Sequence, residues 1–325
     1  MKLKANIYAP ILFGVVLALA GLSTVIFSLI SSLAVDVFLS STIIQLVVYL
    51  LPLAFYLKVR GTDLAASLKI HPVGPQKMPF ITIMTLIFFV GSILLRYMGL
   101  FFFDSAMVET PSAIYIPMEG SNRFLMILCN IILPAVFEEV LFRGILLSEY
   151  RFYGTALSIA TSSLMFAMLH LSLENFFYYV FMGVVFSVIT LASQSIVPAI
   201  LIHIATGFSH MYLRPAVVEY LRQVGKSPIL PYLLIGLFLL LFVFMFSGLE
   251  GIYQDRAYEE LLHSKKELLR REVEKAKMER EEEVEKDEKS RLLVKLKEIF
   301  LSPSFLVCVV IFICLVSDVV KEVSL

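Results

Sequence analysis

The chain has 325 residues, 59% of them hydrophobic, and its 27 basic side chains balance its 27 acidic ones. Soluble domains are nearer to half apolar. Here the excess gives a mean hydropathy of +0.87 and is gathered in runs long enough to cross a bilayer, which takes roughly 20 residues of helix. The composition therefore excludes an ordinary soluble domain and indicates an integral membrane protein.

Apolar runs follow one another along the whole chain, and each is predicted to be a membrane-spanning helix because backbone groups in lipid must be satisfied within the segment. In order, the runs cover residues 11–33, 37–57, 80–103, 124–147, 156–171, 176–191, 198–212, 229–246 and 305–320. The first run is longer than the apolar core of a signal peptide, roughly 7–15 residues, and is predicted to stay as an uncleaved span. The predicted fold class is an all-α, polytopic transmembrane helix bundle with about eight or nine spans.

Basic residues in the loops predict the orientation, since cytoplasmic loops are enriched in Lys and Arg. Lys2 and Lys4 place the N-terminus in the cytoplasm. Counting spans from there puts the basic loop 58–77 inside and the acidic loop 104–121 outside. We therefore expect a multi-pass protein of the cell membrane with a cytoplasmic N-terminus.

A segment rich in Glu, Lys and Arg and free of Gly and Pro covers residues 253–300 on the predicted cytoplasmic side. It is typical of a solvated helix or a linker, and the alternative is a short coiled coil or a helix that binds a partner. The predicted organisation is then N-terminal spans (1–121), a central group of helices (122–213), a further span (214–248), the charged segment (249–302) and a last span (303–325).

Ionisable residues inside the fourth run are the first functional signal, because a charge at mid-bilayer costs at least ~2.5 kcal/mol and needs a partner or a role. Glu139 and Arg143 are spaced to pair on one helix face. Glu138 is turned about 100° away and lacks that partner. Pro134 cannot donate to the carbonyl of Asn130, so we expect a kink before the two acids, with Asn130 nearby as a point of entry for water.

Three of the five histidines lie in the fifth and seventh runs. Phe166 and His170 share a face at i,i+4, while His203 and His210 lie within about 20° of one face, with Thr206 between them. A single membrane histidine is most often a hydrogen-bonding residue in helix packing. Together with a carboxylate, however, the imidazoles form a set that can activate water, bind a metal or hold a polarised carbonyl oxygen.

At these residues the sequence resembles the CPBP family of intramembrane proteases, which includes CAAX-prenyl endopeptidases and bacteriocin-processing or self-immunity (Abi) proteins. The family pattern is EExxxR, then FxxxH on the next helix, then HxxxN or HxxxD. The matching residues here are Glu138, Glu139 and Arg143 for the first motif, Phe166 and His170 for the second, and His203 for the start of the third.

The resemblance implies an intramembrane endopeptidase in which Glu138 activates water, assisted by His170. His203 would help to bind the polarised carbonyl or a metal, with Glu139 and Arg143 as the supporting pair. A divalent metal such as zinc on Glu138, His170 and His203 is one reading, and a metal-free glutamate mechanism is the other. The implied substrates are membrane-associated peptides or proteins, prenylated or bacteriocin-like. Residues 250–302 offer a site for a cytoplasmic partner, and no nucleic-acid partner is expected.

One position departs from the family pattern, because Gly207 stands where Asn or Asp is expected four residues after His203. In the family this residue is thought to stabilise the oxyanion, and losing one such donor typically lowers the rate ~10²–10³-fold elsewhere. Thr206, Ser209 or His210 are the candidates to replace it.

Two alternative functions stay open at this point. Gly207 and the charged segment favour a non-catalytic membrane scaffold or an immunity-type relative. Membrane Glu and His residues also build proton relays, so a proton-coupled transporter is the other alternative. Against the transporter, the sequence has neither repeated halves nor paired broken helices.

Overall fold

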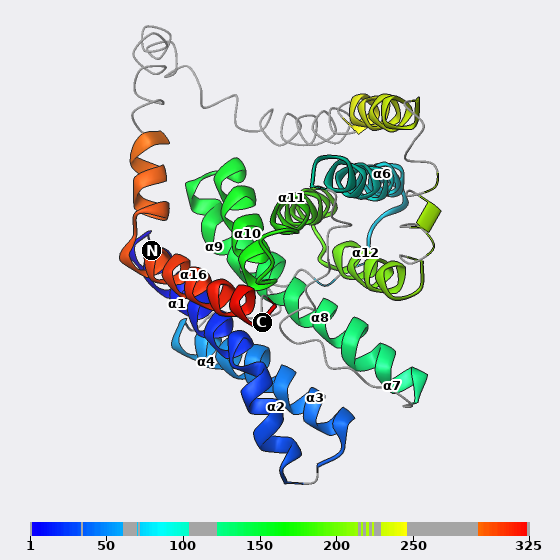
Figure 1. The fold of residues 1–325 in the computed structure, drawn as a ribbon. Coiled ribbons are helices and arrows are strands. Elements are labelled where there is room, and N and C mark those ends of the chain that lie inside the picture. Colours follow the sequence, from blue (N-terminus) through cyan, green and yellow to red (C-terminus); the bar gives the residue numbers. More distant parts are fainter. Residues whose placement is uncertain are drawn as a thin grey trace, which may run out of the picture.

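A computed structural model describes residues 2–33, 35–60, 70, 72–103, 122–213, 216, 219, 220, 223, 229–245 and 292–323. The described part of the chain is helical and contains no strand, which confirms the all-α prediction (Figure 1). Most of the charged segment, residues 249–291, lies outside the described residues, as does the predicted outer loop 104–121.

The first half of the described chain contains α1 (Lys2–Gly21), α2 (Ser23–Ser31), α3 (Val37–Gln45), the π-helical turn η1 (Leu46–Leu50), α4 (Leu51–Arg60), η2 (Pro75–Lys77) and α6 (Met78–Phe103). The central part contains α7 (Arg123–Ile127), the π-helical turn η3 (Leu128–Ile132), α8 (Leu133–Glu139), the π-helical stretch η4 (Val140–Leu146), α9 (Leu147–Tyr150), η5 (Arg151–Tyr153), α10 (Thr155–Leu169), α11 (Phe176–Ser193), α12 (Val197–Phe208) and the π-helical turn η6 (Ser209–Leu213). The chain closes with helices Ile229–Met245, Leu292–Phe300 and α16 (Pro303–Val323).

Each predicted apolar run coincides with a described helix. Those long enough to cross a bilayer by themselves are Val37–Arg60, Pro75–Leu95, Arg123–Tyr153 and Phe176–Ser193. Two bent pairs, Ile7–Gly21 with Ser23–Ser31 and Leu292–Phe300 with Pro303–Val316, add two more if each pair is one span. The described residues thus hold four to six spans by length and composition, against the eight or nine expected. The difference lies in three shorter apolar helices, Thr155–Leu169, Val197–Leu213 and Ile229–Met245.

Helices from opposite ends of the sequence pack together, since α1 and α16 lie side by side (Figure 1). The thiol of Cys308 donates to the carbonyl of Pro10 across this contact, with an Sγ–O distance of 3.0 Å. The last helix is therefore part of the same bundle as the first.

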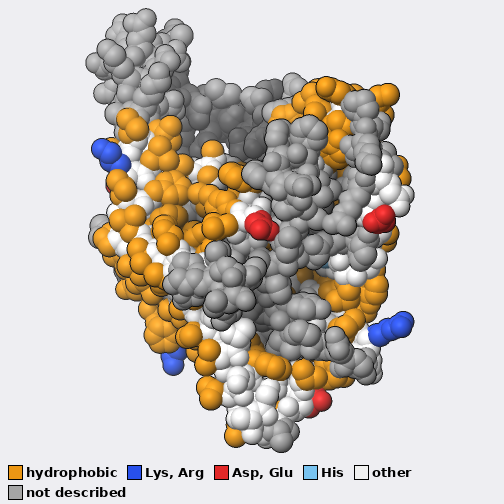
Figure 2. Space-filling view, viewed as in Figure 1, with side chains coloured by type: hydrophobic (Ala, Val, Ile, Leu, Met, Phe, Trp, Pro, Cys, Tyr) orange, Lys and Arg blue, Asp and Glu red, His pale blue; other side chains and the backbone are white. Residues whose placement is uncertain are grey.

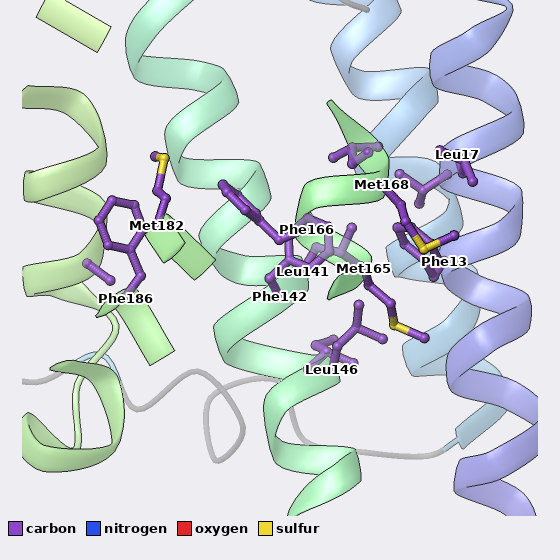
Figure 3. Packing of buried hydrophobic residues seen from close by; sticks show 14 of the residues in the cluster. Phe13, Leu17, Leu141, Phe142, Leu146, Met165, Phe166, Met168, Met182 and Phe186 are labelled. Atoms are coloured by element: carbon purple, nitrogen blue, oxygen red, sulfur yellow. The ribbon is translucent and has the colours of Figure 1, made fainter. Parts of the chain in front are cut away.

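The buried core is centred on a row of aromatic rings between α1, η4, α10 and α11 (Figure 3). The ring of Phe142 lies edge-on to Phe13 at 6.1 Å and to Phe166 at 5.2 Å between centroids. α10 and α11 approach each other closely at Gly183, where a Cβ atom would stand only 2.8 Å from the Cα of Ser163. This packing brings the helix of the two acids, the helix of His170 and α11 into direct contact.

The outer surface is largely apolar, and the view in Figure 2 shows hydrophobic side chains spread over most of the described face with few charges. Large side chains such as Leu33, Phe177 and Tyr232 are about three-quarters exposed, at 74%, 75% and 74%. Surfaces of this kind are suited to lipid, since soluble monomers rarely expose such extensive apolar area. The molecule is accordingly a multi-pass membrane protein, while the cytoplasmic placement of its N-terminus stays a prediction.

Candidate functional site

Two buried carboxylates and one guanidinium form the base of the site. Glu138 and Glu139 are the last residues of α8, with exposed fractions of 4% and 0%. Arg143 Nη1 donates to Glu139 Oε1 at 2.8 Å, which confirms the pair that the i,i+4 spacing predicts. The guanidinium lies over the Phe166 ring at 4.4 Å, and its Nη2 donates to the Gly183 carbonyl at 3.3 Å. These contacts hold Arg143 rigidly beside Glu139.

A π-helical turn, η3, occupies the place where the proline predicts a kink. Arg123–Tyr153 continues as one apolar segment of 31 residues through Pro134. A π turn leaves an α-type hydrogen bond unmade, and such turns are frequent at functional sites. The carbonyl of Cys129 within this turn accepts a hydrogen bond from the Gln45 side chain of α3. A neighbouring helix thus satisfies the backbone where the proline interrupts the regular pattern.

His170 caps the C-terminal end of α10, and its exposed fraction is 8%. Its Nδ1 lies 2.9 Å from the carbonyl oxygen of Phe166, the residue predicted to share its face. Because a carbonyl only accepts, Nδ1 carries the hydrogen and the neutral ring presents a lone pair at Nε2. Tyr179 of α11 stacks on this imidazole at 3.7 Å between ring centroids. The orientation of His170 is therefore fixed from both sides.

His203, on α12, is oriented by the second acid. Its Nδ1 lies 2.9 Å from Glu139 Oε1, the same oxygen that Arg143 binds. Since a carboxylate accepts the bond, Nδ1 carries the hydrogen here too, and Nε2 is left to face Glu138. An imidazole held in this way by a carboxylate has a defined tautomer and direction.

The imidazoles of His170 and His203 both point at one carboxylate oxygen of Glu138. The Nε2 atoms of His170 and His203 each lie 3.8 Å from Glu138 Oε2. This oxygen is buried and has no hydrogen-bond donor among the described residues. The structure therefore brings together Glu138, Glu139, Arg143, His170 and His203, which the sequence predicts as one set.

The buried side chains of the site carry unequal numbers of acidic and basic groups. Two buried carboxylates, Glu138 and Glu139, face a single guanidinium, that of Arg143. An uncompensated charge in a buried site is strongly unfavourable. One additional proton, on Glu138 or His203, would balance the charge of the second carboxylate.

Tyr49 is a site residue that the sequence did not reveal. Its hydroxyl, on η1, donates to Glu138 Oε1 at 3.0 Å, and its exposed fraction is 2%. Tyr49 and Glu138 are separated by 89 residues, so no spacing pattern connects them. The only available signal was a polar group in the middle of an apolar run.

The predicted auxiliary residues have other placements. Thr206 is buried and donates its hydroxyl to the carbonyl of Ile202 in its own helix at 2.8 Å. His210 lies in η6 with Nε2 3.2 Å from the hydroxyl of Tyr178. Asn130 lies in η3, in the helical segment that leads to the acids.

Gly207 lies at a close contact between α12 and η3. A Cβ atom at this position would stand 2.7 Å from Cγ2 of Ile131, nearer than real Cβ contacts allow. The space that an Asn or Asp side chain would need is taken by a β-branched residue whose side chain is stiff. The departure from the family pattern is thus tied to helix packing.

The donor types of Glu138, His170 and His203 are those that zinc takes. However, within the described ranges no three His, Cys, Asp or Glu side chains form a group arranged to hold a metal ion. The separation of 3.8 Å from Glu138 Oε2 to each Nε2 also exceeds the roughly 3.3 Å expected between tetrahedral zinc ligands. These side chains are thus spaced more widely than zinc ligands, and a metal on Glu138, His170 and His203 stays a prediction.

Comparison with known proteins gives one match. Residues 120–209 match the family model described as type II CAAX prenyl endopeptidase Rce1-like. No curated protein and no solved structure matches the chain. The matched residues contain both acids, Arg143, His170 and His203. The resemblance to the CPBP proteases is thereby confirmed over residues 120–209, which match the Rce1-like family model, within a multi-pass, all-helical membrane protein.

Proposed function

We propose that the protein is an intramembrane endopeptidase that hydrolyses peptide bonds of membrane-associated substrates, with Glu138 as the general base. The observation that supports it is the convergence of two imidazole Nε2 atoms on Glu138 Oε2, each at 3.8 Å, inside a largely apolar bundle. A carboxylate shielded from bulk water and flanked by imidazoles is suited to taking a proton from a positioned water molecule.

In the proposed first step, Glu138 Oε2 accepts a proton from water while the water oxygen forms a bond to the carbonyl carbon of the substrate. The electrons of the carbonyl π bond move to its oxygen. The lone pair of His170 Nε2 accepts a hydrogen bond from the remaining O–H of the water and so orients the attack, as its fixed tautomer allows. The electron pair on the substrate oxygen then re-forms the carbonyl, and the carbon–nitrogen bond breaks with its electrons on nitrogen. Glu138 transfers its proton to this nitrogen, which releases an amine and a carboxylic acid.

His203 supplies the proposed oxyanion donor. With one additional proton on the ring, its Nε2–H donates to the developing negative oxygen, while its Nδ1–H keeps the hydrogen bond to Glu139. Glu139 stabilises the imidazolium, and Arg143 balances the remaining negative charge. Preorganised donors in a site that excludes water are worth more than donors in water. With glycine at 207, His203 carries this role without the family's amide or carboxyl side chain.

The matched family's description supports a prenylated CAAX peptide as the first substrate to test. In such peptides the Cys of a C-terminal C-a-a-X sequence carries the lipid, so the peptide bond that follows this Cys is held at the membrane. Bacteriocin-like peptides are the second class. Residues 250–302 remain the proposed site for a cytoplasmic partner.

The decisive experiment measures cleavage by the full chain, purified into lipid nanodiscs, of a prenylated CAAX peptide, its unprenylated form and a bacteriocin-type precursor. Glu138→Gln should lower kcat by about 10²–10⁴-fold, the usual contribution of general acid–base catalysis. Glu298→Gln, a matched change at an exposed carboxylate on helix Leu292–Phe300, should leave the rate unchanged. Equal rates for wild type and Glu138→Gln would reject the proposal.

The two alternative functions have separate readouts. A scaffold or immunity-type protein would cleave none of these peptides and would retain a partner through residues 250–302 in a pull-down. A proton-coupled transporter would show flux in vesicles under a pH gradient. No observation in the described residues favours either over hydrolysis, since Gly207 is accounted for by its contact with Ile131.

A further inference from the structure

We propose that Tyr49 is a positioning residue that holds Oε1 of Glu138, so that Oε2 is the oxygen that takes the proton from water. This inference rests on the proposed function and deepens it. Tyr49 lies on η1, outside the residues 120–209 that match the family model. The matched unit alone therefore lacks this group.

The two oxygens of a carboxylate are chemically equivalent until the surroundings distinguish them. Here the hydroxyl of Tyr49 donates to Oε1 at 3.0 Å, while Oε2 has no donor among the described residues and faces the two imidazoles. A hydrogen bond to an ionised carboxylate is stronger than one between neutral groups. The bond from Tyr49 therefore makes Oε1 the anchored oxygen and leaves Oε2 as the reactive one.

The ring of Tyr49 is itself held in place. It stacks on Phe137, the residue before Glu138, at 6.0 Å between centroids with an interplanar angle of 16°. Its exposed fraction of 2% leaves it little freedom to rotate. The hydroxyl is thus delivered to Glu138 by a rigid aromatic support.

A second contact fixes the register of the helix that carries Tyr49. Gln45, one turn earlier and fully buried, donates its side-chain amide to the carbonyl of Cys129. The two bonds connect α3 and η1 to the helix of the acids at two levels along its length. Gln45 therefore offers a control that disturbs the same helix pair without touching Glu138.

The test compares Tyr49→Phe with Gln45→Leu in nanodiscs, using the peptide that wild type cleaves. Tyr49→Phe keeps the ring and removes the hydroxyl, so we expect kcat to fall about 10-fold or more with KM unchanged, since substrate binding does not involve Oε1. Gln45→Leu should lower the thermal midpoint while kcat of the folded protein stays near that of wild type. In the Glu138→Gln background, Tyr49→Phe should cause no further loss, because the two changes act on one unit.

The inference is overturned if Tyr49→Phe retains the wild-type kcat, or if its loss of kcat is no larger than that of Gln45→Leu. If Tyr49→Phe does not fold, 3,5-difluorotyrosine at position 49 keeps the packing and alters the strength of the donor. An unchanged kcat for that variant would likewise overturn it. Failure of the proposed function is distinguishable, because it would appear first as equal activity of wild type and Glu138→Gln.

Discussion

Glu139 accepts a hydrogen bond from His203 on α12, with 2.9 Å between Oε1 of the acid and Nδ1 of the ring. The same oxygen accepts from Arg143 at 2.8 Å. One buried carboxylate oxygen therefore accepts hydrogen bonds from two basic side chains, Arg143 and His203, which lie on different helices. Glu139 connects the helix of the acids to α12 and sets the direction in which His203 Nε2 points.

Replacing Glu139 by Gln should separate these roles. The amide no longer enforces the tautomer of His203 and cannot balance an imidazolium, so we expect kcat to fall about 10²–10⁴-fold, as when an imidazole loses its carboxylate elsewhere. Breaking a buried pair also leaves Arg143 uncompensated, which should lower the free energy of unfolding by about 3–5 kcal/mol. Cleavage assays and thermal unfolding measure the two effects.

A double variant provides the control for this prediction. Glu139→Gln with Arg143→Met removes both members of the pair, so much of the lost stability should return while the activity should not. Recovery of activity in the double variant would contradict the role assigned to Glu139.

The contact between Gly207 and Ile131 predicts an overpacking effect. Gly207→Ala introduces a Cβ atom where Cγ2 of Ile131 stands 2.7 Å away, and should cost about 1–3 kcal/mol of unfolding free energy. Combining it with Ile131→Ala, which removes Cγ2, should return part of this stability. Thermal unfolding of the two single variants and the double variant checks the prediction, and additive losses would contradict it.

Metal removal gives a further prediction. Because Glu138, His170 and His203 do not form a metal-holding group as arranged, we expect activity after dialysis against a chelator to stay within about two-fold of the untreated enzyme. Metal analysis of the same sample by mass spectrometry provides the matched measurement. Loss of activity that added zinc restores would instead assign a metal to these three residues.

A second ion pair, half-buried between α4 and α9, should affect stability without affecting the chemistry. Arg60 on α4 binds Glu149 on α9 through Nη2 at 2.8 Å, and the Tyr56 hydroxyl donates to the same carboxylate at 2.8 Å. Glu149→Gln leaves the half-buried Arg60 without its carboxylate partner. It should lower the free energy of unfolding by about 1–3 kcal/mol, between the values for exposed and for buried pairs. We expect a lower thermal midpoint with an unchanged kcat. A loss of kcat similar to that of Glu139→Gln would show that this pair also shapes the site.

Local patterns in the sequence predicted much of this arrangement. Each predicted apolar run falls on a described helix, because lipid demands internally bonded backbone. The i,i+4 spacing predicted the Glu139–Arg143 pair, and the same spacing placed Phe166 beside His170. These relationships depend on residues within one helix, where geometry is fixed by the helical repeat.

The other contacts of the site are made between helices, and no spacing in the sequence predicts which residues of two helices meet. Tyr49 reaches Glu138 across 89 residues. The sequence shows only that Gly207 lacks the side chain of the family's Asn or Asp. The structure adds that this position lies in close contact with Ile131. The π turns were not predicted either. Pro134 indicates an irregular helix, but a proline alone does not distinguish a kink from a π turn.

Helix Val37–Arg60 is fastened to the helix of the acids at three depths, through Gln45, Tyr49 and Arg60. A shift of this helix by one turn would break all three polar links together and strand their buried partners. The helical segments Val37–Arg60 and Arg123–Tyr153 therefore form one rigid unit. A movement that opened a path to Glu138 while keeping these three links would have to displace other helices of the bundle.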